Sequence, residues 1–118
     1  MMLETEFPKC KPQWETKKKL HSDDFRLRYK ALRNLSSNFI SRPDVRNQIF
    51  NQKGAACYLC GSVENLQIDH IISVYRGAKE KISYDLINSF GNLMPICARC
   101  NSLKGWQGTY VRATKTGD

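Results

Sequence analysis

The chain of 118 residues lacks any apolar run long enough to cross a membrane. Its first eleven residues also lack the hydrophobic stretch of a secretory signal. We therefore expect no membrane partner and a cytosolic setting. No internal repeat is present beyond two Cys-x-x-Cys pairs. In a reducing compartment such pairs bind metal more often than they form disulfides.

Acidic residues are scarce, with 11 Asp and Glu against 19 Lys and Arg, and the formal net charge is +8. Twelve of the basic residues lie within residues 1–56, where only six acidic residues occur. This balance suits a polyanionic partner, and nucleic acid is the first candidate. The alternative is ordinary solubility, so charge alone does not decide the function.

The length predicts one domain, which we divide into three segments. Residues 1–53 are expected to form a tail, with Phe7 and Trp14 as docking residues, followed by two helices. Residues 54–106 have short apolar runs between turn signals, and residues 107–118 form a polar tail. A core confined to the middle segment would be small, and cores of that size need a metal or disulfides.

The first helix is predicted from Ser22 to Ile40, with Ser22 as its N-cap. Its apolar residues recur at steps of three and four and form a stripe that we expect to be buried: Phe25, Tyr29, Leu32, Leu35 and Phe39. Three basic residues fall outside this stripe: Arg26, Lys30 and Arg33. They are either a solvated face or contacts for phosphates.

The second helix is predicted from Pro43 to Gln52, with Ser41 as its cap and Gly54 as its end. Further along, the sequence predicts a β-prone segment, a polar loop, a helical turn, a short extended segment containing Pro95, and a last helix that ends at Gly105. Their residue ranges are 66–74, 77–83, 84–90, 93–96 and 98–105, in that order.

The four paired cysteines are Cys57, Cys60, Cys97 and Cys100, and 36 residues (61–96) separate the pairs. Two residues between cysteines let both sulfurs of a pair reach one ion from a tight turn. Two such pairs complete the tetrahedral set that Zn²⁺ prefers. Four thiolates leave no open coordination position, so we expect a structural zinc ion. The fifth cysteine, Cys10, is predicted to be a free thiol.

Between the cysteine pairs, His70 is the only histidine, and it follows Asp69, which is flanked by apolar residues. A carboxylate in such surroundings needs a partner, and a cation would serve. Asn92 follows a glycine at a predicted turn. Asn101 and Lys104 lie three residues apart on the last predicted helix and share a face. A lone histidine on a strand is more often structural, but these neighbours favour a site.

The pattern Asp-His-Ile at 69–71, Gly-Asn-Leu at 91–93 and Cys-x-x-Cys-Asn-x-x-Lys at 97–104 closely resembles the HNH endonuclease family. The upstream cysteine pair matches the zinc-stapled subgroup of this family. The resemblance covers about residues 55–106. It implies an α+β fold with a small ββα-metal module and a four-cysteine zinc site, which here follows an N-terminal helical region.

The resemblance also implies a metal-dependent endonuclease that nicks or cuts double-stranded DNA by hydrolysis. Carried over by position, His70 is the general base that activates water, and Asp69 and Asn101 bind the catalytic divalent metal. Asn92 holds the loop between the strands and orients the histidine. Lys104 matches a lysine that is frequent near the site. Adjacent strand residues point to opposite faces, so Asp69 and His70 share one site only if the strand twists or bulges.

Asn101 occupies the position of the second histidine of the HNH motif. Members of the family with asparagine at this position are known. A carboxylate and an amide oxygen are hard ligands, so we expect Mg²⁺ or Mn²⁺. Ser73 and Gly77-Ala78 replace the Pro and Gly-Gly that often follow Asp-His, so the chain departs from the family pattern in this loop.

Two further expectations follow, together with one alternative. The N-terminal helices are expected to contact DNA or to form a homodimer. By analogy, a small nuclease of this type fits phages and mobile elements, and hence a bacterial or phage-infected cell. The alternative from another class is a non-catalytic zinc-knuckle protein that binds nucleic acid.

Overall fold

The computed structural model describes residues 6–105, so the expectations for Trp106 and for the tail at 107–118 lie outside the described residues. The elements in chain order are α1 (Trp14–Leu20), α2 (Phe25–Ile40), α3 (Pro43–Lys53), β1 (Leu66–His70), α4 (Val74–Lys79), α5 (Tyr84–Ile87), the 3₁₀ helix η1 (Phe90–Asn92), β2 (Leu93–Cys97) and α6 (Ala98–Lys104). No helix within residues 6–105 is long and apolar enough to cross a membrane.

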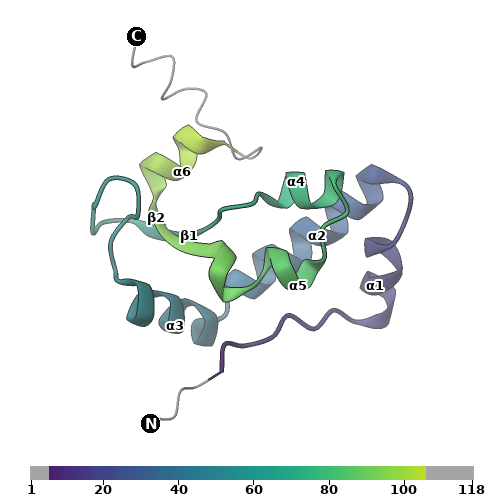
Figure 1. Cartoon of the computed structure of the whole chain (residues 1–118), viewed down its shortest axis with the longest axis horizontal. Coiled ribbons are helices and arrows are strands. Elements are labelled where there is room, and N and C mark those ends of the chain that lie inside the picture. The colour runs from purple at the N-terminus through teal and green to yellow at the C-terminus, as the bar shows by residue number, and fades with distance from the viewer. Residues whose placement is uncertain (1–5, 106–118) are drawn as a thin grey trace.

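Strands β1 and β2 form a two-stranded antiparallel sheet, in which Asp69 lies opposite Met94 and His70 opposite Leu93. Each strand has one open side, which is why β2 tolerates Pro95. A two-stranded sheet is marginal by itself and needs helices to cover it. Helix α6 packs on both strands and α3 packs on β2, and Figure 1 shows these two helices on opposite sides of the sheet.

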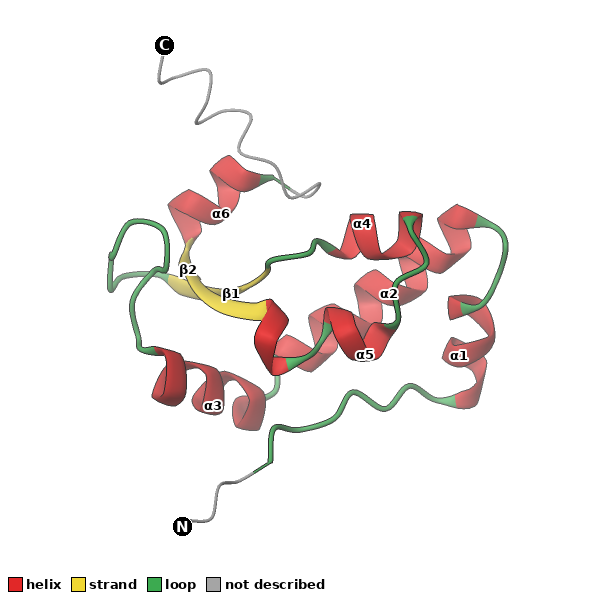
Figure 2. Ribbon diagram, viewed as in Figure 1, coloured by secondary structure: helices red, strands yellow, loops and turns green. Residues whose placement is uncertain are grey.

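The N-terminal helices and the sheet share one apolar interior. A first cluster joins buried side chains of α2, α3, β1 and β2: Phe39, Val45, Ile49, Ile68 and Leu93. A second cluster joins Leu32 of α2 to Ala78 of α4 and Ile87 of α5. Figure 2 shows α2 running alongside both of these short helices. Helix α2 therefore stabilises the segment between the strands as well as its own end of the chain.

Helix α2 begins three residues later than predicted, because Asp24 rather than Ser22 is its N-cap. The Asp24 side chain accepts a hydrogen bond from the amide of Arg26 at 3.0 Å. The hydroxyl of Ser22 accepts instead from the amide of Asp24. The prediction of Ser41 as the cap of α3 is also wrong, since its hydroxyl donates to the carbonyl of Ser37 at the end of α2.

The predicted N-terminal tail contains a helix that the sequence did not indicate. Helix α1 has no buried residue and packs as a short arm on α2. Trp14 is 69% exposed, so the prediction that it docks is wrong. Phe7 does dock, because its ring meets the edges or faces of Phe39 and Phe90 at centroid distances of 5.9 and 5.3 Å.

The polar loop predicted for residues 77–83 is in part helix α4. Ser73 caps this helix by accepting a hydrogen bond from the amide of Arg76. Gly77 and Ala78 are buried on its inner face. The guanidinium of Arg28, buried on α2, donates to the carbonyl of Ala78 at 2.7 and 3.0 Å. These bonds fix the end of α4 to α2.

Gly77 lies where α4 approaches Ile87 most closely. A Cβ atom at this position would stand 2.7 and 2.8 Å from two atoms of the Ile87 side chain, which is fully buried. An alanine in a helix normally stabilises it relative to glycine. We predict the opposite for Gly77→Ala, a loss of about 1–3 kcal/mol in the free energy of unfolding because the site is overpacked.

Chemical denaturation followed by circular dichroism would measure this loss. Gly91→Ala is the matched control, because a Cβ atom at Gly91 meets nothing within 4 Å and its backbone needs no positive φ. Equal stability of the two variants would contradict the close packing of α4 on α5.

Candidate active site and metal centre

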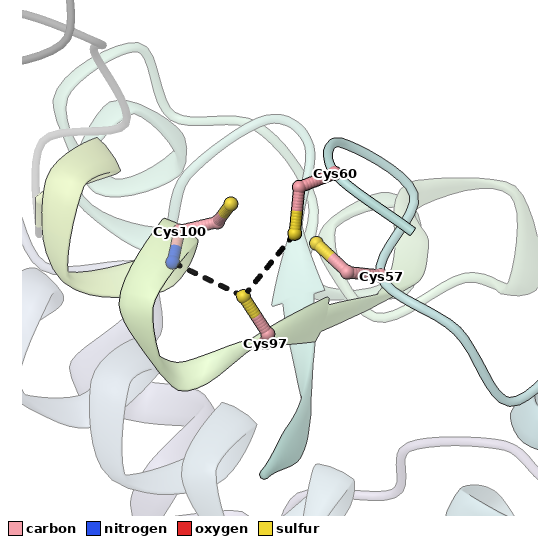
Figure 3. Close-up of side chains that lie close together, drawn as sticks. All are labelled: Cys57, Cys60, Cys97 and Cys100. Carbon is pink, nitrogen blue, oxygen red and sulfur yellow. Dashed lines mark hydrogen bonds between the residues drawn. The ribbon is translucent and has the colours of Figure 1, made fainter. Parts of the chain in front are cut away.

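The four paired cysteines converge from two segments of the chain. Cys57 and Cys60 lie in the turn before β1, Cys97 ends β2, and Cys100 lies in the first turn of α6. All four sulfurs lie within 4.8 Å of one another (Figure 3). The sulfurs of Cys60 and Cys97 are 3.7 Å apart. Tetrahedral zinc with bonds near 2.3 Å sets sulfurs about 3.8 Å apart, so the cluster fits a zinc ion.

Backbone amides point at two sulfurs of the cluster and favour the thiolate form of Cys57. The amide of Leu59 points at the sulfur of Cys57, and that of Cys100 points at the sulfur of Cys97, each at 3.4 Å. Burial raises the pKa of Cys57, but backbone hydrogen bonds outweigh burial and leave this pKa below its ordinary value. Thiolates are the form that binds metal, so this chemistry agrees with the expected structural ion.

Helix α6 and strand β1 are joined by two pairs of side chains. Gln67 and Asp69 alternate along β1 and so share one face of the strand. The amide nitrogen of Asn101 donates to Oε1 of Gln67 at 2.6 Å, and Nζ of Lys104 donates to Oδ2 of Asp69 at 2.5 Å. The cysteine cluster holds the start of α6, and these pairs hold its remainder against the strand.

The carboxylate of Asp69 is 7% exposed and has the cationic partner that its apolar neighbours require. Its oxygen Oδ2 accepts from Lys104 and, at 2.8 Å, from the hydroxyl of Tyr58. Its other oxygen, Oδ1, accepts from no residue within 6–105. No buried side-chain oxygen or nitrogen in that part of the chain lacks a partner, so Oδ1 of Asp69 is open to solvent.

The ring of His70 is held by a hydrogen bond with Asn88. Nε2 of His70 lies 2.8 Å from Oδ1 of Asn88. The amide nitrogen of the same Asn88 donates to the hydroxyl of Ser36 at 3.0 Å and to the sulfur of Cys10 at 3.6 Å. By the same reasoning as for Asp69, Nδ1 of His70 has no hydrogen-bond partner within the described chain and is not completely buried.

Burial determines the charge of this histidine. It lowers the pKa of His70 below its ordinary value, and the nearby ammonium of Lys104 acts in the same direction. The hydrogen bond with Asn88 and the charge of Asp69 partly oppose the shift. The ring is therefore neutral at pH 7.

Asn92 is buried and fixes the backbone that leads out of β1. Its Oδ1 accepts from the amide of Ile72 at 2.7 Å, and its Nδ2 donates to the carbonyls of Ile72 and Ile87 at 3.1 and 2.8 Å. The side chain that contacts the His70 ring is that of Asn88. Nothing in the sequence distinguishes Asn88, which lies between Ile87 and Ser89, from an ordinary surface asparagine.

Four of the side chains described above border one hollow of about 240 Å³, together with Arg33 of α2. The four are Asp69, His70, Asn101 and Lys104. The pairing of β1 with β2 is unbroken at Asp69 and His70, so no bulge brings them together. Asp69 turns toward α6 and His70 toward Asn88, and both reach the hollow because β1 ends at His70. Asn92 is not among the residues that border the hollow.

The two strands and α6, held together at the cysteine cluster, match the ββα-metal module that the sequence pattern predicted. Residues 57–107 match the family described as HNH endonuclease. No curated protein and no solved structure gave a significant match to the chain. The segment that holds the cysteine cluster and most of the hollow is therefore similar to the HNH endonuclease family.

Proposed function

We propose that the hollow at the end of β1 is the active site of a metal-dependent endonuclease, which hydrolyses phosphodiester bonds of double-stranded DNA. The observation that carries this proposal is the set of open atoms around the hollow. An imidazole nitrogen and a carboxylate oxygen have no hydrogen-bond partner within residues 6–105, although both side chains are otherwise held by hydrogen bonds. Side chains held in this way are preorganised to bind something else.

The hydrogen bonds of Asn88 determine which nitrogen of His70 acts as the base. The amide nitrogen of Asn88 already donates to Ser36 and Cys10, so the atom facing the ring is its oxygen, which can only accept. Nε2 of His70 must then carry the proton. In the neutral ring Nδ1 is left with a free lone pair on the open side. We assign Nδ1 as the atom that takes a proton from water.

Asp69 and Asn101 are the residues that would hold a catalytic divalent metal. Oδ1 of Asp69 accepts no hydrogen bond from the part of the chain that the structure describes, and Asn101 uses its amide nitrogen for Gln67, which leaves its amide oxygen. These are hard oxygen donors, which fit Mg²⁺ or Mn²⁺. When bound, such an ion polarises the phosphate and stabilises the leaving oxyanion.

Lys104 is a positioning residue of this site, because it holds Asp69 and His70 in place. Its ammonium donates to Oδ2 of Asp69 and, at 2.9 Å, to the carbonyl of His70, so it contacts both residues of the Asp-His pair. It is 7% exposed and already engaged, which argues against a large movement toward DNA. Asn92 has a comparable role, since it fixes the backbone at Ile72, two residues after His70. One such site hydrolyses one strand, so a double-strand break requires two copies or two visits.

The rival function is a zinc-knuckle protein that binds nucleic acid without cleaving it. A binder needs the cysteine cluster and the basic surface. It does not need a neutral histidine with a free nitrogen beside a free carboxylate oxygen. These groups favour the nuclease.

The variant His70→Ala is expected to lower the rate of plasmid nicking by about 10²- to 10⁴-fold, because the general base is removed. Supercoiled plasmid would be incubated with Mg²⁺ or Mn²⁺ and resolved on gels. Zinc content should stay close to that of the wild type and the variant should stay folded, since the ring lies outside the zinc cluster. Wild-type protein that leaves the plasmid supercoiled with either metal would support the binder, and unfolding of His70→Ala would make the ring structural.

Asn88→Leu is expected to release the ring of His70 and lower kcat about tenfold with little change in KM, since one hydrogen bond is worth about 1–1.5 kcal/mol. Imidazole ¹⁵N chemical shifts report the tautomer. His70 should be the Nε2–H form in the wild type and a mixture in the variant.

Two internal references accompany the Asn88 measurement. His21, the other histidine, is exposed and should not change between the two proteins. Asn47→Leu makes the same substitution at an exposed position of α3. A wild-type ring protonated at Nδ1 would contradict the assignment of the base.

Cys97→Ser is expected to abolish stoichiometric zinc binding and the cooperative thermal transition, because small zinc domains draw folding energy from the ion. Zinc released to a chromogenic chelator and circular dichroism would measure the two effects. Cys10→Ser is the matched control, since Cys10 lies outside the cluster and the variant should keep one zinc per chain. Retention of zinc by Cys97→Ser would remove this residue from the ligand set.

A further inference from the structure

One face of α2 carries basic side chains that no acidic group neutralises. Arg26, Lys30 and Arg33 are all exposed, and none forms an ion pair with a residue in 6–105. Their spacing of four and three residues places them in one row along the helix. We call this row the basic face of α2. Helix α2 lies outside residues 57–107, the part that matches the family.

The basic face points away from the protein interior. Leu32 and Phe39, which are buried, lie on the opposite side of the same helix, as 3.6 residues per turn requires. Substitutions on the basic face therefore need not disturb the core. The nearest acidic residues at the start of the helix are already engaged. Asp24 caps α2 and Asp23 lies 3.5 Å from Lys81.

One end of the basic face borders the proposed active site. Arg33 lines the hollow together with Asp69, His70 and Lys104. Its guanidinium stands over the ring of Tyr29, 5.9 Å from the ring centroid, which orients a side chain that would otherwise be free. From Arg33 the row continues through Lys30 to Arg26. This distance is about 10 Å at 1.5 Å per residue.

We propose that the basic face of α2 binds the phosphate backbone of the DNA that enters the hollow. Along its axis, one strand of the duplex presents a phosphate about every 3.4 Å, so a row of about 10 Å can follow several successive phosphates. Arg33 would hold the phosphate nearest to the reacting bond, and Lys30 and Arg26 would hold the flanking backbone. The inference deepens the proposed function, on which it rests, by naming how the duplex is held.

Contacts of this kind position the duplex and do not read its sequence. Removing one of them should weaken binding to all sequences alike and should make binding less dependent on salt. Each lost phosphate contact lowers the slope of log K against log salt concentration by about 0.9 for double-stranded DNA. The slope can be measured by fluorescence anisotropy with a labelled duplex of about 25 base pairs, without added Mg²⁺ or Mn²⁺, so that no cleavage occurs.

We expect the triple variant Arg26→Gln, Lys30→Gln, Arg33→Gln to lower the slope by about 2–3. The single variant Arg33→Gln should lower it by about 1 and should also raise KM for nicking. Arg46→Gln is the matched control. It removes one positive charge from α3, which lies on the other side of the sheet from α6 (Figure 1), and it should leave the slope unchanged.

The outcomes separate this inference from the proposed function. An unchanged slope in the triple variant overturns the inference. A loss in Arg46→Gln equal to that in Arg33→Gln also overturns it, because it would reduce the effect to net charge. Failure of the wild type to nick DNA under Mg²⁺ or Mn²⁺ counts against the proposed function instead. A lowered slope in the triple variant would then still support a DNA-binding face on α2. Melting temperatures close to that of the wild type would show that the variants are folded.

Discussion

The convergence of four sulfurs at the junction of a loop, a strand and a helix is the constraint on which the rest of this structure depends. A sheet of two five-residue strands and a seven-residue helix bury too little apolar surface to hold one another. The cluster fixes the start of α6 to the turn before β1. Asn101 and Lys104 follow within one turn of Cys100, so the position of the cluster decides which residues of β1 they meet. The metal-binding geometry thereby sets the geometry of the hollow.

The second constraint is the buried pair of Asp69 and Lys104. Removing either partner from a buried ion pair leaves an uncompensated charge, which is costly, whereas the intact pair contributes little net stability. The pair matters here because it orients the carboxylate of Asp69. With Lys104 and Tyr58 both bonded to Oδ2, the carboxylate of Asp69 cannot rotate freely, and its other oxygen is left without a partner within residues 6–105. The buried pair of Asp69 and Lys104 thus serves mainly to fix the orientation of Oδ1 of Asp69.

The sequence predicted the module closely and its surroundings less well. Spacing alone identified the cysteine cluster, because a tight turn and a tetrahedral ion leave little choice. The last helix and its end at Gly105 were also correct. The resemblance pointed to Asp69, His70 and Asn101, and the structure brings these three to one hollow. Their chemical roles stay predictions. Asn88 was missed because its importance comes from contacts with Ser36 and Cys10, which are 52 and 78 residues away along the chain.

Errors at the helix ends have local causes. Ser22 and Asp24 are both good capping residues, and only the contacts of the folded chain decide between them. Helix α1 has no apolar stripe and exists because it rests on α2, which periodicity cannot detect. Helix α4 was mistaken for a loop because Gly77 is a poor helix former. Its burial against Ile87 overrides that propensity, as tertiary packing often does.

The link from His70 through Asn88 to Ser36 and Cys10 also bears on where a working unit of this protein begins. A fragment excised at residue 57 would retain every sulfur of the cluster. It would nevertheless leave the amide nitrogen of Asn88 without either of its acceptors, and that amide could then turn and present a donor to the ring. The smallest autonomous form of the site is therefore longer than the family domain. It must reach back at least to Ser36, and to Cys10 if both acceptors are to be kept.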